Sequence, residues 1–305
     1  MKVFISYSHQ QDEWVLDRLA PVLECAGVEI LIDQRNVGAG KDIGRQVLGS
    51  QDQADKQILV FSPDYFKSDW CIPEMNHALE INKQTGQELI IPVIRVSCES
   101  PEPLKNTRHV NLIDDGSEDE WKKLLDACEA DLKIPAPYWL QKRDELRDVL
   151  GQDQSVNLVL DSKFNWRALL KHLKNPYITK NKIPDFKSVD LNSGAADTRR
   201  NLVKCIVNTF GGTPDFKEDG ELAFLDRFFK GKHGWCRLEF QHMDTIKSKD
   251  DFDVKLFNAL CHLVDERALL LFMISRDSLL NLLPNTDPRF NQVSSLATRC
   301  KMVKF

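Results

Sequence analysis

The sequence of 305 residues has no long hydrophobic segment, no paired-cysteine motif and no dense block of basic residues. Its longest apolar run, residues 268–274, is far shorter than the roughly 18 residues that a membrane helix needs. The first residues turn polar too soon for a secretory signal. Eight scattered cysteines without C-x-x-C spacing indicate reduced thiols rather than a zinc site. We therefore expect a cytoplasmic protein with no membrane partner and no metal.

Charge is distributed unevenly along the chain. Residues 1–150 carry 17 basic and 27 acidic side chains, whereas residues 151–305 carry 24 basic and 19 acidic ones. The acidic first half argues against nucleic-acid binding, and the second half is too mildly basic to indicate it. The remaining composition, 42% apolar and 29% charged, is that of a globular protein, and the length fits two domains of about 150 residues each.

In the first half, short apolar segments alternate with segments of helical periodicity. The segments expected as strands are residues 2–7, 28–32, 57–61, 88–96 and 109–113. Because they lack polar alternation, they indicate a parallel sheet covered on both faces, and right-handed crossovers make it a flavodoxin-like, five-stranded sheet. Ligands of such sheets bind outside the carboxyl ends of the strands. The side chains expected to border a pocket there are Ser6, Ser8, Asp33 and Arg35.

Trp70 and Glu74 stand four residues apart, so on a helix they share one face. Pro73 lacks an N–H group and is tolerated only near the first turn, which predicts a helix that starts near Ser68 or Asp69, either of which can cap it. An indole beside a carboxylate near the rim of a strand-end pocket would provide a stacking surface and a fixed negative charge. No metal ligand set accompanies this pair.

Three ordered blocks, residues 4–8, 33–43 and 62–75, resemble the opening strand, the second strand with its BB loop, and the W-C-x-x-E helix of TIR domains. We accordingly predict a TIR domain over residues 1–134. The resemblance implies that Glu74 is catalytic, that Trp70 lines the pocket, and that NAD+ is a substrate rather than a cofactor. It also implies self-assembly through neighbouring TIR units. The residues assigned to the BB loop, which makes these contacts, are Val37, Gly38, Gly40 and Lys41.

A single carboxylate suits cleavage of the nicotinamide–ribose bond of NAD+. Nicotinamide leaves a cationic pyridinium as a neutral molecule, so no general acid is needed, and a carboxylate can stabilise the positive charge that develops on the ribose. The resemblance thus implies an NAD+ glycohydrolase, active when assembled, in bacterial antiphage defence or cell-suicide signalling. Three alternatives stay open: cyclisation of NAD+ to a cyclic ADP-ribose messenger, a non-catalytic scaffold that acts by homotypic contact, and a nucleoside deoxyribosyltransferase.

Residues 135–154, which open on Pro135 and Pro137, are expected to form a linker helix and loop, followed by a second α/β domain over residues 155–305. Its expected strands are residues 155–161, 188–191, 235–240, 267–275 and 299–305. Their order with the intervening helices resembles a STAND-type P-loop NTPase. Residues 161–164 replace the phosphate-binding loop, however, so we expect a degenerate module that docks a regulatory protein or ligand. An unrelated α/β domain is the alternative.

Overall fold

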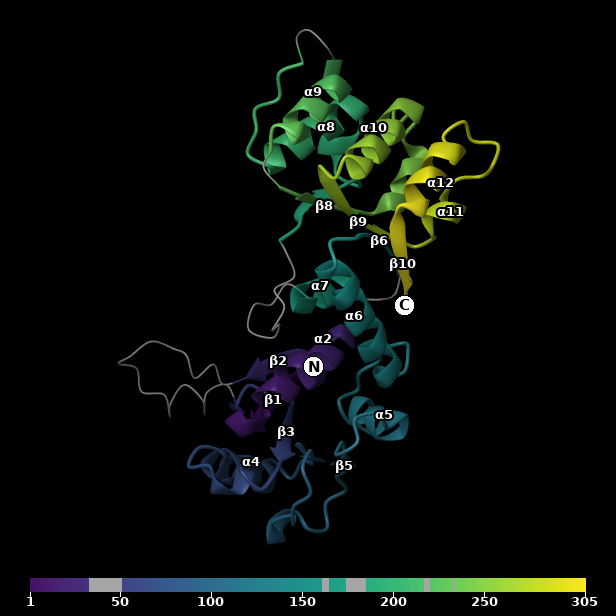
Figure 1. Ribbon diagram of the computed structural model, residues 1–305. Coiled ribbons are helices and arrows are strands. Elements are labelled where there is room, and N and C mark those ends of the chain that lie inside the picture. Colours follow the sequence, from purple (N-terminus) through teal and green to yellow (C-terminus); the bar gives the residue numbers. More distant parts are fainter. Residues whose placement is uncertain (33–50, 161–164, 174–184, 217–219, 233) are drawn as a thin grey trace. The chain divides into compact units, whose positions relative to one another are not determined.

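The computed structural model describes residues 1–32, 51–160, 165–173, 185–216, 220–232 and 234–305. Their contacts divide the chain into two compact units, Met1–Gln141 with Lys163–Ile178 and Lys142–Ser162 with Thr179–Phe305. Each unit contains a five-stranded parallel sheet (Figure 1). The expected fold class, a flavodoxin-like sheet followed by a second α/β domain, is therefore confirmed. The domain boundaries expected at residues 134 and 155 stay a prediction.

The sheet of the first unit has the strand order β2-β1-β3-β4-β5, which is the flavodoxin-like order. Its strands are β1 (Lys2–Tyr7), β2 (Glu29–Ile32), β3 (Lys56–Phe61), β4 (Ile90–Ile94) and β5 (Val110–Asn111). β1 and β3 are buried from their second residue onward, as expected for inner strands with helices on both faces. β5 is shorter than the expected 109–113 and pairs only with Val93 and Ile94 of β4.

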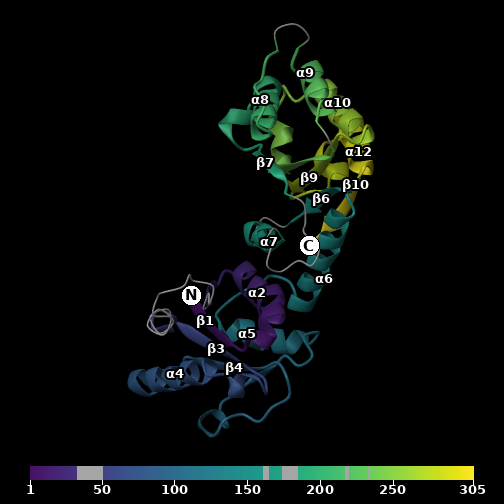
Figure 2. The same cartoon turned by 60° about the vertical axis from the view of Figure 1, so that its left-hand side comes forward.

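Helices cover both faces of this sheet (Figure 2). They are α1 (Asp12–Trp14), α2 (Ala20–Cys25), α4 (Cys71–Thr85), α5 (Glu118–Ala127), the start of α6 (Ala136–Gly151), and the short turns η1 (His9–Gln11), η3 (Tyr65–Lys67) and η4 (Glu102–Leu104). The helical segment between β1 and β2 is composite, because the π-helical turn η2 (Val15–Leu19) joins α1 to α2. Pro21, which has no N–H to donate, accounts for this local change of hydrogen bonding.

The second unit has the strand order β10-β6-β9-β8-β7. Its strands are β6 (Ser155–Val159), β7 (Lys187–Asp190), β8 (Cys236–Gln241), β9 (Leu269–Ser275) and β10 (Cys300–Lys304). Its helices are α8 (Arg199–Thr209), α9 (Gly220–Lys230), α10 (Val254–Asp265), α11 (Leu279–Leu282) and α12 (Phe290–Thr298). Two short turns, η5 (Gly194–Ala196) and η6 (Met243–Ser248), lie between them in the sequence. One apolar cluster joins these helices to β8 and β9. α12 was not expected from the sequence, although Val293 and Leu296 show its buried spacing.

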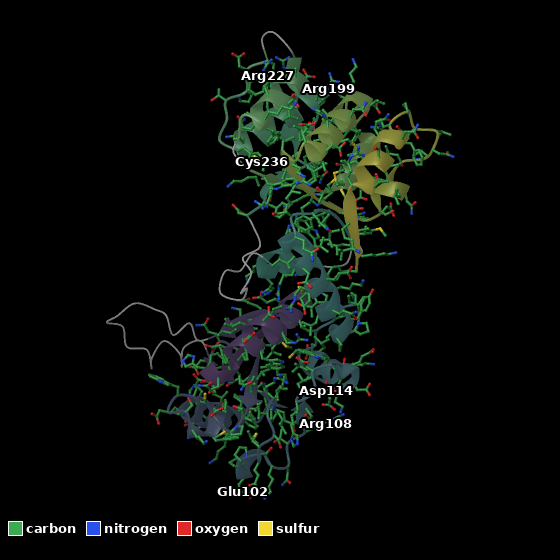
Figure 3. The ribbon with its side chains drawn as sticks, in the orientation of Figure 1. Glu102, Arg108, Asp114, Arg199, Arg227 and Cys236 are labelled. Carbon is green, nitrogen blue, oxygen red and sulfur yellow. The ribbon has the colours of Figure 1, made fainter. Side chains whose placement is uncertain are left out.

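Arg199, at the start of α8, connects three helices of the second unit. Its guanidinium donates a hydrogen bond of 2.7 Å to Glu221 of α9 and one of 2.5 Å to Asp253, which caps α10. Figure 3 shows Arg199 among these helices. Charged contacts of this kind fix the relative orientation of the helices over the sheet.

α7 (Trp166–Leu173) lies between β6 and β7 in the sequence, but its contacts place it in the first unit. There it binds the last turn of α2 through the carboxylate of Glu24. Lys171 donates to both carboxylate oxygens at 2.9 and 3.0 Å, and Nε2 of His172 lies 2.6 Å from Oε2. Burial opposes ionisation, yet the hydrogen bonds from His172 and Lys171 outweigh it and lower the pKa of Glu24 below its ordinary value.

Because the pKa of Glu24 is lowered in the folded state, its contribution to the attachment of α7 is fully present above the ordinary pKa of 4.5 and is lost as the pH falls through the folded value. We expect Glu24→Gln to speed hydrogen exchange in α7 about tenfold at neutral pH, the low end of the effect of losing one charged hydrogen bond. The wild type and the variant should converge at low pH. Equal exchange at pH 7 would contradict this assignment.

In the part of the chain that the structure describes, no helix combines the length and the apolar character that crossing a membrane requires.

Candidate functional site

A buried hydrogen-bond chain lies at the carboxyl end of β1. The Ser6 hydroxyl donates to Oε2 of Glu74 at 2.5 Å, and the same Ser6 oxygen lies 2.9 Å from the hydroxyl of Tyr65. The exposed fractions are 1% for Ser6, 3% for Glu74 and 0% for Tyr65. β1, α4 and η3 therefore bring together three side chains that are up to 68 residues apart in the sequence. Among the expected site residues, the structure brings Ser6 and Glu74 into direct contact.

Local sequence explains how α4 presents Glu74. The Ser68 hydroxyl accepts the backbone N–H groups of Trp70 and Cys71 at 3.3 Å each, so Ser68 stabilises the start of the helix as expected. The helix itself begins at Cys71, two to three residues later than expected. Pro73 then occupies the third position, where no intrahelical N–H is required. Glu74 follows at the end of the first turn, and its backbone N–H donates to the carbonyl of Trp70.

Trp70 lies just outside the helix, at its N-cap, and 46% of it is exposed. It is thus accessible rather than part of the core. Its role as a wall of a substrate pocket stays a prediction.

The other expected site residues divide into two groups. Ser8 is buried and its hydroxyl accepts the N–H of Gln10 at 3.4 Å, so in this structure it caps η1. The remainder fall within residues 33–50, outside the described part of the chain; these are the pocket residues Asp33 and Arg35 and the assembly-loop residues Val37, Gly38, Gly40 and Lys41.

Sequence reasoning missed three buried polar residues beside Glu74. Tyr65 belongs to the block that resembles the TIR family, but nothing in its local pattern indicates a contact with Ser6. Gln51 donates from Nε2 to the backbone carbonyl of Glu74 and to Oε1 of Gln57, both at 2.7 Å. Both glutamines are fully buried. A fully buried glutamine is unusual, because an amide is costly to bury without partners. The contacts that Gln51 makes from Nε2 depend on the tertiary structure.

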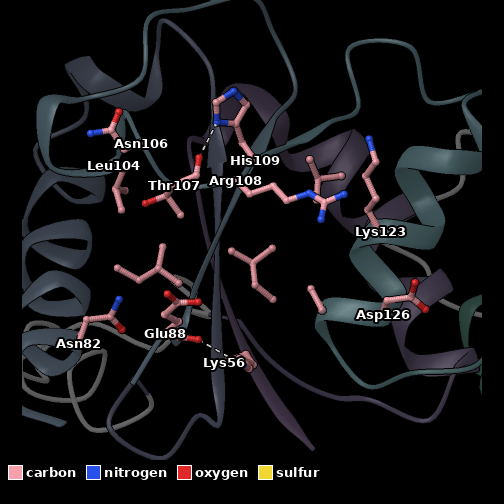
Figure 4. Close-up of a pocket in the computed structure, with 14 residues that line it drawn as sticks. Lys56, Asn82, Glu88, Leu104, Asn106, Thr107, Arg108, His109, Lys123 and Asp126 are labelled. Carbon is pink, nitrogen blue, oxygen red and sulfur yellow. Dashed lines mark hydrogen bonds between the residues drawn. The ribbon is translucent and has the colours of Figure 1, made fainter. Parts of the chain in front are cut away.

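A separate cavity of about 670 Å³ opens at the opposite, amino-terminal edge of the same sheet (Figure 4). Lys56, Glu88, Arg108 and Lys123 contribute charged groups of both signs to its lining. Neither Ser6 nor Glu74 lines this cavity. Among the described residues, no cluster of three or more His, Cys, Asp or Glu side chains has the geometry to hold a metal ion.

In the second unit, polar side chains gather where β7 and β8 end. Nδ1 of His242 lies 2.6 Å from Oδ1 of Asp190, and His242 adopts a left-handed backbone conformation with φ of 58°. The fully buried Glu239 accepts hydrogen bonds from Ser188 at 3.0 Å and from Gln241 at 2.6 Å. Residues 161–164, expected to replace a phosphate-binding loop, lie outside the described residues.

Residues 3–125 match the family model for the TIR domain. Together with the flavodoxin-like strand order, this match identifies the N-terminal region of the chain as a TIR domain. The match ends within α5, so it covers only elements of the first unit.

Toll-like receptor 6 of Bos taurus is 37% identical over 91 residues, which are 30% of this chain and 12% of the receptor. An uncharacterized protein of Sinorhizobium fredii, y4lF, is 36% identical over 101 residues, or 32% of this chain and 31% of that protein. The chain thus spans less than a third of the length of either relative.

Two solved structures are similar to part of this chain. The TIR domain of the Toll-related receptor TRR-2 from Hydra magnipapillata is 26% identical, with a TM-score of 0.36, and the alignment covers 41% of this chain and 94% of that domain. A prokaryotic SEFIR domain is 24% identical, with a TM-score of 0.34, over 41% of this chain and 96% of that domain.

Proposed function

We propose that the TIR domain cleaves the nicotinamide–ribose bond of NAD+ and that Glu74 is its catalytic carboxylate. The observation that supports this most directly is the hydrogen bond between Ser6 and Glu74. It holds a carboxylate in a fixed orientation, almost fully buried, at the edge of the sheet where ligands of this fold bind.

The chemistry needs only one acidic group. When the bond between C1′ and the nicotinamide nitrogen breaks, its electron pair neutralises the pyridinium, and nicotinamide leaves without being protonated. Positive charge then develops on the ribose. A nearby carboxylate stabilises that charge strongly in a site that excludes water. Water attacks C1′ and loses a proton to the solvent, which yields ADP-ribose. Attack by the adenine of the same molecule instead would yield a cyclic product.

The burial of Glu74 suggests how the enzyme is kept inactive. With 3% of the residue exposed, NAD+ reaches the carboxylate only after neighbouring groups move. We therefore propose that activity depends on self-assembly through the TIR domains, with a regulatory protein or ligand acting at the second unit. Tight control is expected of an enzyme that would otherwise consume cellular NAD+. Bacterial antiphage defence or cell-suicide signalling is the setting we propose.

We further propose that the second unit is a degenerate NTPase-like module. Its single parallel sheet, with β6 between β9 and β10, supports this interpretation. In such sheets a ligand would bind at the carboxyl edge, where His242 and Asp190 lie.

A non-catalytic TIR scaffold is the second candidate function. A hydrogen bond such as the one from Ser6 is also what a buried carboxylate with a purely structural role needs. A scaffold would signal through homotypic contacts and leave NAD+ intact.

Mass-resolved product analysis separates these candidates. The full chain is incubated with NAD+ at increasing protein concentration while its oligomeric state is monitored. We expect release of nicotinamide that rises more steeply than protein concentration, because assembly activates the site. ADP-ribose identifies hydrolysis, and a product lighter by one water identifies cyclisation. Intact oligomers that release no nicotinamide would favour the scaffold. Base exchange on deoxynucleosides would favour a deoxyribosyltransferase.

A further inference from the structure

We infer that Tyr65 is a positioning residue for Glu74: its hydroxyl sets the direction of the Ser6 hydroxyl, which in turn holds the carboxylate. This inference rests on the proposed function for its catalytic consequence, but the hydrogen-bond chain itself can be tested separately.

The direction of donation along these hydrogen bonds follows from the number of protons that the three side chains carry. In the ionised state that the proposed chemistry requires, the Glu74 carboxylate has no proton to donate, so the Ser6 hydroxyl donates its single proton to it. Ser6 then has only lone pairs left for the contact of 2.9 Å with Tyr65. In that state the phenol of Tyr65 is the donor. Three side chains thus form one directed chain from Tyr65 through Ser6 to Glu74.

Tyr65 is held in place firmly enough to act in this way. Its ring packs edge-on against Phe61, with the ring centroids 5.3 Å apart, and against Phe66, with the centroids 5.5 Å apart. Its backbone N–H lies within hydrogen-bond distance of both the hydroxyl and the carbonyl oxygen of Ser62, at 3.2 and 3.1 Å. A fully buried ring with these contacts has a single orientation available.

This hydrogen-bond chain has two consequences for the carboxylate of Glu74. Donation to the ionised form favours that form over the neutral acid. A hydroxyl that receives a hydrogen bond is also polarised and donates more strongly, so Tyr65 reinforces the bond that Ser6 makes. Without the phenol hydroxyl, Ser6 loses the partner that fixes its rotamer, and Glu74 is held less firmly in the ionised, oriented state.

The first test is kinetic and uses the full-length Tyr65→Phe variant. We expect kcat to fall about tenfold, the usual scale for one lost buried hydrogen bond, while KM stays within about twofold. The acidic limb of the pH profile should move to higher pH, because the ionised carboxylate loses support. Ser6→Ala should also lower kcat and move the acidic limb of the pH profile to higher pH. In the double variant, adding Tyr65→Phe to Ser6→Ala should cause little further loss of kcat. Tyr138→Phe, which alters a more exposed tyrosine on α6, is the matched control.

The second test does not require activity. In protein labelled with carbon-13 at glutamate carboxyls, the Glu74 resonance is identified as the one absent from Glu74→Gln. We expect it to titrate at higher pH in Tyr65→Phe than in the wild type. A wild type that releases no nicotinamide would overturn the proposed function and leave this measurement intact. Unchanged titration, or an unchanged pH profile in an active variant, would overturn the role of Tyr65.

Discussion

Replacing Glu74 by Gln is expected to abolish nicotinamide release, with a loss of about a thousandfold or more, the scale seen when electrostatic stabilisation of a transition state is removed. The amide has the same shape as the carboxylate, and its oxygen still accepts the hydrogen bond from Ser6, so the fold should survive. Only the negative charge that opposes the developing positive charge on the ribose is lost. The measurement is the rate of nicotinamide release by the assembled full-length protein at saturating NAD+.

Glu80→Gln provides the matched control, since it makes the same chemical change on the same helix at an exposed position. It should retain wild-type activity. A folded, assembled Glu74→Gln protein that retains full activity would remove Glu74 from the mechanism. If Glu80→Gln lost as much activity, the effect would have to be attributed to the charge of the helix rather than to a site.

The Leu271→Ala substitution in the second unit is expected to have the largest effect on stability. Leu271 lies on β9, between β6 and β8, is completely buried, and belongs to the apolar cluster under the helices of that unit. Removing its side chain leaves a cavity, at a cost of about 2–5 kcal/mol in the free energy of unfolding. Because every residue of this cluster belongs to the second unit, we expect this loss in the second unit and little change in the first.

Hydrogen exchange followed by mass spectrometry across a urea series measures this effect unit by unit. Peptides from β8 and β9 should lose protection at lower urea in the variant, whereas peptides from β1 and β3 should not. Leu280→Ala, at a residue that is 50% exposed, is the control and should change stability by less than about 0.5 kcal/mol. Equal destabilisation of both units would show that they unfold as one cooperative structure.

Much of the fold could be predicted from local pattern. Every expected strand of the second half has a counterpart among β6 to β10. The inner strands β6 and β9 are buried throughout, as is typical of short apolar segments between turns. Prediction was weaker for two other elements. β5 is reduced to Val110 and Asn111, and α12 was missed although Val293 and Leu296 have helical spacing. Edge strands and short helices depend on their neighbours more than on their own residues.

The candidate site was predictable only in part. Parallel strands bring their carboxyl ends to one edge, and this rule is enough to place Ser6 in the region of the site from the sequence. The start of α4 followed from Ser68 and Pro73, with an error of two to three residues, because a cap and a missing N–H act locally. No comparable rule connects Tyr65 with Ser6, since their contact depends on how the ring of Tyr65 packs against its aromatic neighbours.

The sequence alone determined the two parallel sheets, the TIR character of the N-terminal region and the place of Glu74 near the first turn of a helix. These features arise from periodicity, capping and residue order, which act over a few neighbouring residues. Only the tertiary structure decided that Glu74 is buried against Ser6, that Tyr65 completes the chain, and that α7 binds Glu24 of α2 rather than remaining with its neighbours in sequence. Contacts between distant residues depend on packing and on the need to pair buried polar groups. Neither can be predicted from the sequence of a single segment.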